Sequence, residues 1–93
     1  MIRSFAHLSN EQLLANLKRC AESERHATAR LIAILAELDA RRLYLAQGCS
    51  SLFTYCTQVL HLSAHAAYGR IEAARAGRRF PIVLELLADA RSI

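Results

Sequence analysis

Apolar residues near the start of the chain recur at three- and four-residue spacing, which is the pattern of one face of an α-helix. Ser9 and Gln12 have the spacing of a capping box, in which each side chain caps the backbone of the other residue. Three leucines and a cysteine then follow on one face. The pattern predicts a helix over residues 10–21.

A second apolar stripe begins near Ser23 and continues until Gly48, a residue that readily takes the left-handed backbone found at helix ends. It predicts a longer helix over 24–46, and the two helices together form a helical hairpin over 9–47. At 1.5 Å per residue the second helix would be about 33 Å long, which is long for a chain of this size. We therefore expect part of it to pack against a second copy in a homodimer.

The second half of the chain has serines and a proline at the places where helices begin. After Gly48, two adjacent serines can each cap a short helix that ends near Leu60. Ser63 caps a helix predicted over 64–78, and Pro81 suits the first position of a fifth helix. A short helix, a three-residue turn and a capped helix are the layout of a helix-turn-helix.

The composition supports this interpretation. Of 93 residues, 54% are hydrophobic, three are Gly and one is Pro, and no segment alternates as a β-strand does. The sequence therefore predicts one all-α domain over 1–93, with about five helices, a long second helix and a helix-turn-helix-like part over 48–90. A chain this short cannot form a large catalytic fold.

Charge and cysteine usage bear on partners and location. The chain has 12 Lys and Arg against 8 Asp and Glu, a formal net charge of +4, and three cysteines, which is an odd number. Its start lacks the features of a signal peptide, and the apolar stretch from Leu31 is broken at Glu37. We expect a cytoplasmic protein with reduced thiols and no membrane segment.

Most of the excess positive charge falls on the predicted helix over 64–78 and the residues just after it. Residues 48–80 contain four arginines and one glutamate, which gives +3. Guanidinium groups suit phosphate because they are planar, permanently charged and bidentate. We predict contacts to the DNA backbone with weak sequence specificity, made by Arg70, Arg75, Arg78 and Arg79 with help from His65 and Tyr68.

Another face of the same helix consists of small residues, which allow the close approach of another backbone. That backbone can be a nucleic acid or a second protein helix. The alternative hypothesis is thus a helical dimerisation or protein-interaction module with no nucleic-acid role. Its interface residues would be Ala66, Gly69, Ala73 and Ala76.

Signals for catalysis and metal binding are weak. Cys49, Cys56, His61 and His65 offer zinc-type ligands, but their spacing does not match that of zinc fingers. No histidine is placed beside a cysteine to hold a thiolate, and no Gly-rich phosphate loop is present. We therefore expect a chain that is not an enzyme and that takes no cofactor, metal or small-molecule substrate.

Several stretches of the sequence are similar to a known family. They are Arg41-Arg42-Leu43-Tyr44, Gly48-Cys49-Ser50-Ser51-Leu52-Phe53-Thr54-Tyr55-Cys56, Leu62-Ser63, Ala67-Tyr68, Arg70-Ile71-Glu72-Ala73-Ala74-Arg75 and Arg78-Arg79-Phe80-Pro81. Together they resemble the helical N-terminal region of bacterial HNH endonuclease-like proteins, over about Leu8 to Asp89.

The resemblance implies a region that binds DNA, dimerises or presents a separate C-terminal nuclease domain. None of that domain's metal-binding residues has a counterpart in residues 1–93. The stretch from Leu60 to Arg75 is also similar to the helix-turn-helix of ParB-type partition proteins, where a Leu-Ser step opens the recognition helix.

Overall fold

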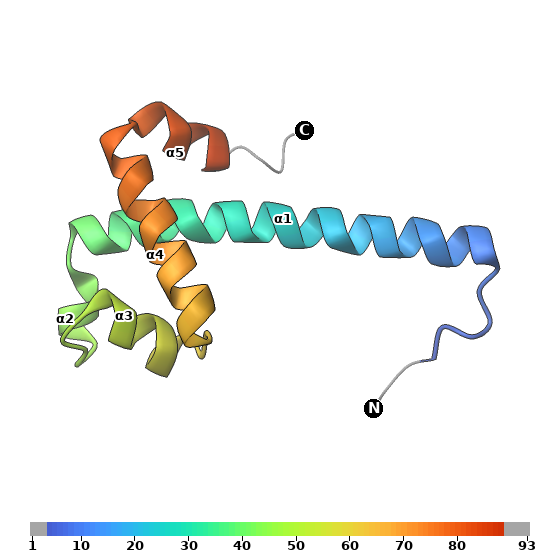
Figure 1. The fold of residues 1–93 in the computed structure, drawn as a ribbon, viewed down its shortest axis with the longest axis horizontal. Helices are drawn as coiled ribbons and strands as arrows, with labels where there is room; N and C mark the ends of the chain where they lie inside the picture. Colours follow the sequence, from blue (N-terminus) through green and yellow to red (C-terminus); the bar gives the residue numbers. More distant parts are fainter. Residues whose placement is uncertain (1–3, 89–93) are drawn as a thin grey trace.

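The computed structural model describes residues 4–88, which form five α-helices, one π-helical turn and no β-strand (Figure 1). The elements are α1 (Asn10–Ala40), α2 (Leu43–Ala46), α3 (Leu52–Thr54), the π-helical turn η1 (Tyr55–Val59), α4 (Ala64–Arg79) and α5 (Pro81–Ala88). The prediction of an all-α chain with about five helices, one of them long, is confirmed. Residues 89 and 90 of the predicted 48–90 part lie outside the described residues.

The first 31 helical residues form one continuous helix, α1. Its start is the predicted capping box: the Gln12 N–H donates to Ser9 Oγ (3.2 Å) and the Ser9 N–H donates to Gln12 Oε1 (3.0 Å). The predicted hairpin over 9–47, with separate helices over 10–21 and 24–46, is wrong. No Gly or Pro stands between the two stripes, and a continuous helix keeps every backbone N–H there bonded, so Ser23 does not act as a cap.

The long helix also ends earlier than predicted, at Ala40 rather than 46. Arg42 has a left-handed backbone (φ 52°), which turns the chain into the single turn of α2. Gly48 takes the expected positive φ (81°) and ends α2 instead, with its N–H donating to the Leu45 carbonyl (3.1 Å). None of the helices in residues 4–88 is both long and apolar enough to cross a membrane.

The predicted short helix before Leu60 begins at its serine cap, since Ser51 accepts a hydrogen bond from the Thr54 N–H (3.0 Å). Its second half is π-helical. The Thr57 hydroxyl donates to the Phe53 carbonyl (3.0 Å), the group that an α-helical Thr57 N–H would bond, and this competition favours the wider turn. His61 is then left-handed (φ 59°), and Ser63 caps α4 by accepting from the Ala66 N–H (3.1 Å).

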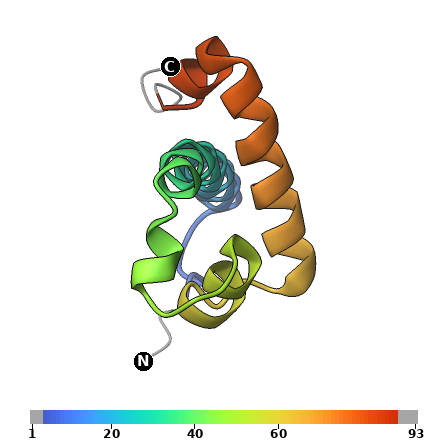
Figure 2. The ribbon, with the colours of Figure 1, turned by 90° about the vertical axis from the view of Figure 1, so that its left-hand side faces the viewer.

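The other helices gather around the C-terminal half of α1. Viewed along α1, α4 lies on one side of it, α5 above it, and α2 and α3 below it (Figure 2). Buried side chains from these helices form one core, which comprises Leu35, Ala36, Leu52, Cys56, Ala67, Ile71 and Ala74. In the described chain, the N-terminal half of α1 projects away from this core with no helix against it (Figure 1).

Small residues let the helices approach closely. Ala36, Ala67 and Ala74 are almost fully buried. Gly77 is buried too, and a Cβ at this position would overlap the side chain of Leu84 in α5. The glycine therefore sets how closely α5 returns to α4.

We expect the helical glycines of α4 to respond to alanine with opposite signs. Gly77→Ala should lower the free energy of unfolding by about 1 kcal/mol, the lower end of overpacking costs, because Leu84 can shift. Gly69→Ala should raise it by about 0.5–1 kcal/mol, because its Cβ would meet no atom within 4 Å and alanine favours the helix. Urea unfolding followed by circular dichroism measures both, and equal effects would contradict this packing.

Candidate nucleic-acid interface

A shallow groove of about 690 Å³ runs along the outer face of α4. Its lining residues are His65, Tyr68, Gly69, Ile71, Glu72, Arg75, Ala76 and Arg79. Four of the six residues predicted to contact DNA lie here, together with two of the four residues predicted for a helix interface. Cationic and small positions that the sequence pattern assigns to two separate faces thus share one surface.

The aromatic and imidazole groups of the groove come from the first turns of α4. Tyr68 is 65% exposed, and its ring lies 4.8 Å from that of Phe53 with a tilt of 31°. This contact supports one face of the tyrosine on the segment before the turn. His65 is exposed one turn earlier.

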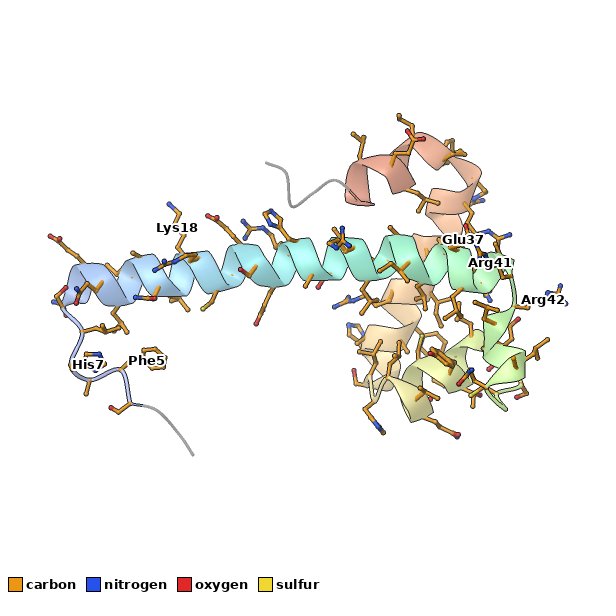
Figure 3. The ribbon with its side chains drawn as sticks, turned by 180° about the vertical axis from the view of Figure 1, so that it is seen from behind. Phe5, His7, Lys18, Glu37, Arg41 and Arg42 are labelled. Carbon is orange, nitrogen blue, oxygen red and sulfur yellow. The ribbon has the colours of Figure 1, made fainter. Side chains whose placement is uncertain are left out.

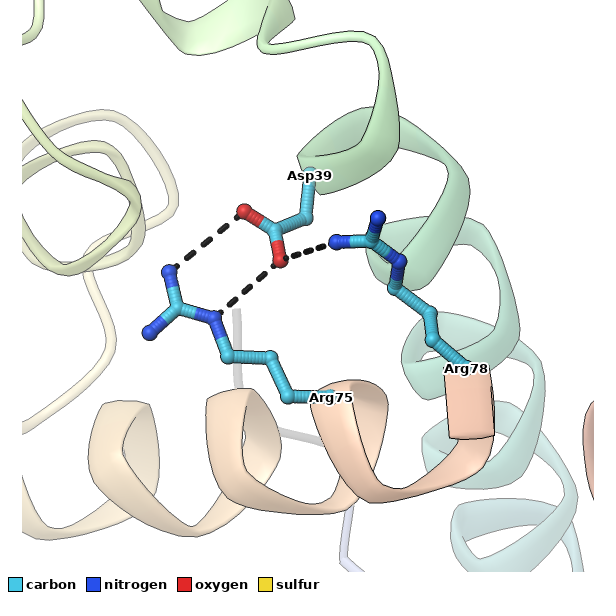
Figure 4. A network of polar contacts seen from close by, with 3 residues as sticks. All are labelled: Asp39, Arg75 and Arg78. Carbon is cyan, nitrogen blue, oxygen red and sulfur yellow. Dashed lines mark hydrogen bonds and ion pairs between the residues drawn. The ribbon is translucent and has the colours of Figure 1, made fainter. Parts of the chain in front are cut away.

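Two of the four predicted arginines are held by a carboxylate that the sequence analysis did not single out (Figure 4). Arg75 Nε donates to Asp39 Oδ2 (3.1 Å) and Arg75 Nη2 to Oδ1 (3.4 Å). Arg78 Nη1 donates to the same Oδ2 (3.0 Å). Asp39 is the one buried charged residue in the part of the chain that the structure describes, at 7% exposure.

The electrostatics of this cluster favour the charged forms. Burial raises the pKa of Asp39, but the hydrogen bonds and charges of Arg75 and Arg78 outweigh it, so the pKa lies below the ordinary 3.8. The hydrogen bond to Asp39 raises the pKa of Arg75 in turn. One carboxylate against two guanidinium groups leaves a net charge of +1.

The remaining arginines do not extend the groove into a larger patch. Arg70 is half-buried and lies nine residues before Arg79, which places the two about 180° apart on the helix. Arg79 is exposed and forms no ion pair with any residue of the 4–88 range. Elsewhere, Arg41 pairs with Glu37 (2.7 Å) and Arg42 is exposed beside it (Figure 3).

Of the four small residues predicted as an interface, two line the groove and two lie beside it. Gly69 and Ala76 line the groove, and Gly69 is exposed. Ala66 and Ala73 are half-buried at its side. The predicted small face is therefore only partly open to a partner.

The candidate metal and thiol residues do not come together as one metal site in the structure. Within residues 4–88, no three His, Cys, Asp or Glu side chains come together as a metal site would need. Cys49 and Cys56 are buried. Burial raises the pKa of the Cys56 thiol, which keeps it protonated at neutral pH.

Asp39→Asn should lower the free energy of unfolding at pH 7 by about 1.5 kcal/mol, because hydrogen bonds to a charged group are lost while both arginines stay half-exposed. The folded-state pKa of Asp39 is depressed, so its stabilisation is present above 3.8 and is lost as the pH falls through the lower folded value. The gap between the native protein and the variant should therefore close in acid.

Urea unfolding at a series of pH values measures this gap. Glu37→Gln is the matched control, because it breaks an exposed pair worth only about 0.3–0.5 kcal/mol. A variant gap that stays constant down to strong acid would contradict the role given to Asp39.

Comparisons of the chain with protein-family models, with curated proteins and with solved structures found no match. The similarity to HNH endonuclease-like proteins and to ParB-type proteins therefore stays a prediction from the sequence.

Proposed function

We propose that this chain is a non-catalytic helical module that binds the DNA phosphate backbone along the outer face of α4. The observation that carries the proposal is the groove in which Arg75, Arg79 and His65 flank the small residues Gly69 and Ala76. Small side chains let a sugar-phosphate strand come close to the helix, and the arginines then reach its phosphates.

The Asp39 contact supports this role. Two of the three guanidinium nitrogens of Arg75 bind Asp39, which fixes the side chain in place before any ligand arrives. The third nitrogen carries two N–H donors that Asp39 does not use. A pre-positioned arginine loses less side-chain entropy on binding, so the phosphate contact made by Arg75 gains affinity.

Binding of this kind should be weakly specific. Gly69 and Ala76 have no groups that read base edges, and guanidinium contacts to phosphate carry no sequence information. The net charge of +4 adds non-specific attraction to DNA. Affinity then depends on charge and falls steeply with salt.

The module would act in the cytoplasm. As the sequence resemblance implies, it would work together with a separate HNH-type nuclease domain. The chain would bind DNA as a homodimer while the separate domain performs the cleavage. The helix-turn-helix-like corner supports this use of α4, because α3 and η1 precede it through a short turn and Ser63 caps it.

The second candidate function is a helical dimerisation or protein-interaction module with no nucleic-acid role. It is favoured by the large apolar side chains that α1 exposes outside the core, among them Leu13, Leu17 and Ile34. Gly69 and Ala76 of α4 would then receive a protein helix instead of DNA.

The test of the DNA proposal is a titration of a fluorescent generic duplex, followed by anisotropy at about 50 and 200 mM salt. We expect binding at low salt that weakens about tenfold at high salt for each chain in contact with DNA, because Arg75 and Arg79 offer about two phosphate contacts. Arg79→Gln should weaken low-salt binding and reduce the salt slope by about 1, because one phosphate contact is lost.

Arg41→Gln is the matched control, because Arg41 is an exposed arginine on another helix that already pairs with Glu37. It should leave the salt slope nearly unchanged. No binding at either salt concentration, or equal effects of the two substitutions, would reject the α4 groove as the DNA site.

Gly69→Leu separates the two candidate functions. The position is open, so the leucine should leave the fold intact while it fills the groove. If DNA docks there, the anisotropy change at low salt should drop and the oligomeric mass should stay the same. Loss of the oligomer with DNA binding retained would instead support a protein partner on α4.

A further inference from the structure

Helix α1 carries a second pattern besides its core-facing stripe. Eight positions alternate at four- and three-residue steps along almost its whole length, as the a and d positions of a coiled coil do. They are Leu13, Leu17, Cys20, Glu24, Ala27, Leu31, Ile34 and Leu38, and we name them the α1 seam. Seven of the eight are apolar, and Glu24 stands near the middle.

Part of the seam is uncovered by the described chain. Leu13 is 47% exposed, Leu17 68% and Ile34 60%. Leu31 and Leu38, by contrast, are half-buried against the edge of the core.

Near its C-terminal end, the seam is the floor of an apolar groove of about 490 Å³. The side chains of Tyr55 and Leu60 form a wall of this groove. Figure 2 shows that the other helices surround α1 on three sides and leave the fourth open.

The two ends of the seam complement each other. The N-terminal half of α1 carries exposed leucines, and no other helix of the described chain packs on it (Figures 1 and 3). The C-terminal half carries the groove that would receive such a helix. A second copy placed head to tail satisfies both ends at once, which is the self-complementarity that a two-fold interface requires.

Charge on α1 permits this contact. Residues 10–29 contain three acidic residues (Glu11, Glu22 and Glu24) and three basic ones (Lys18, Arg19 and Arg25), so this segment has no net charge that would repel the second copy. The excess positive charge lies in the rest of the chain. The seam runs from Leu13 to Leu38, so a second helix can follow α1 over most of its 31 residues.

Two features decide whether the two α1 helices run parallel or antiparallel: the position of Glu24 and the position of the folded body at the C-terminal half of α1. Parallel helices would place Glu24 against the same residue of the second copy and would bring two cationic bodies together. Antiparallel helices place Glu24 opposite the small Ala27 and put the two bodies at opposite ends. In this register Leu13 lies opposite Leu38 of the second copy, Leu17 opposite Ile34, and Cys20 opposite Leu31.

We propose that a second copy of this chain docks on the α1 seam in antiparallel orientation, with the exposed leucines of each copy in the groove formed by α1 and η1 of the other. The contact is apolar and does not depend on DNA binding. It leaves the outer face of each α4 free.

Sedimentation equilibrium over a range of concentrations tests the contact. The native chain should be a dimer whose dissociation constant changes little between about 50 and 200 mM salt, whereas DNA binding falls steeply over that range. Leu17→Glu and Ile34→Glu should each raise the dissociation constant about a hundredfold or more, because every lost leucine or isoleucine contact occurs twice in a two-fold dimer.

Leu86→Glu is the matched control, since Leu86 is equally exposed (66%) but lies on α5. It should leave the dimer intact, and thermal unfolding followed by circular dichroism should show a cooperative transition for all three variants, because the packing of α4 and α5 on α1 does not involve these side chains. A native chain that stays monomeric at the highest concentration reached, or a dimer that the seam variants leave intact, would overturn the proposal. DNA binding measured on the same samples is a separate result and decides neither outcome.

Cysteine cross-linking tests the direction. In the antiparallel register the two native Cys20 residues are 11 positions apart along the helices, about 16 Å, which is beyond the reach of a disulfide. Leu31→Cys should therefore form a covalent dimer with oxidised glutathione, while the native chain and the Leu31→Cys, Cys20→Ser double variant should not. Cys49 and Cys56 are buried and do not interfere. A rapid disulfide between native Cys20 residues would show parallel helices and reject this register.

Discussion

The contact between Asp39 of α1 and the two arginines of α4 fixes how the two longest helices cross. Asp39 is buried at the end of α1, and Arg75 and Arg78 reach it from successive turns of α4. A buried carboxylate is tolerated only where charged partners compensate for its lost hydration, so the crossing is restricted to positions that keep both arginines near it. Small core residues such as Ala67 and Ala74 then allow the helices to touch.

This constraint also shapes the cationic surface. Arg78 is turned toward Asp39, Arg70 lies at the flank of the core, and only Arg75 and Arg79 remain in the groove on the outer face. The surface that could meet a phosphate backbone is therefore narrower than a count of arginines suggests. One of its two guanidinium groups is also held in a fixed position, because Arg75 binds the Asp39 carboxylate.

Helix α1 serves two different purposes along its length. Its C-terminal half provides the wall on which α4 and α5 pack, and its N-terminal half extends beyond the folded body. A free helix of this length gains little stability from backbone hydrogen bonds alone, and most helices depend on packing of an apolar face. An antiparallel dimer would supply that packing and would hold the two α4 grooves at opposite ends of the assembly.

The sequence by itself determined the local features of this protein. Capping serines at Ser9, Ser51 and Ser63 start helices where expected, and Gly48 takes the predicted left-handed turn, because these signals act within four residues. The sequence pattern did not predict the continuity of α1 through Ser23. A serine that can cap a helix does so only where ending the preceding helix lowers the free energy of the whole fold.

Tertiary structure decided the rest, because it depends on which groups meet. The role of Asp39 could not be read from one acid within an apolar stripe, as its partners lie 36 and 39 residues further on. The sequence also could not show that Arg75 and Arg78 bind Asp39 while Arg79 stays exposed and unpaired within the described residues. The alternating positions of the α1 seam are visible in the sequence, but only the packing of the other helices shows that Leu13, Leu17 and Ile34 are left exposed while Leu31 and Leu38 lie against the core. Local chemistry sets where each helix starts, and long-range contacts set which faces remain free.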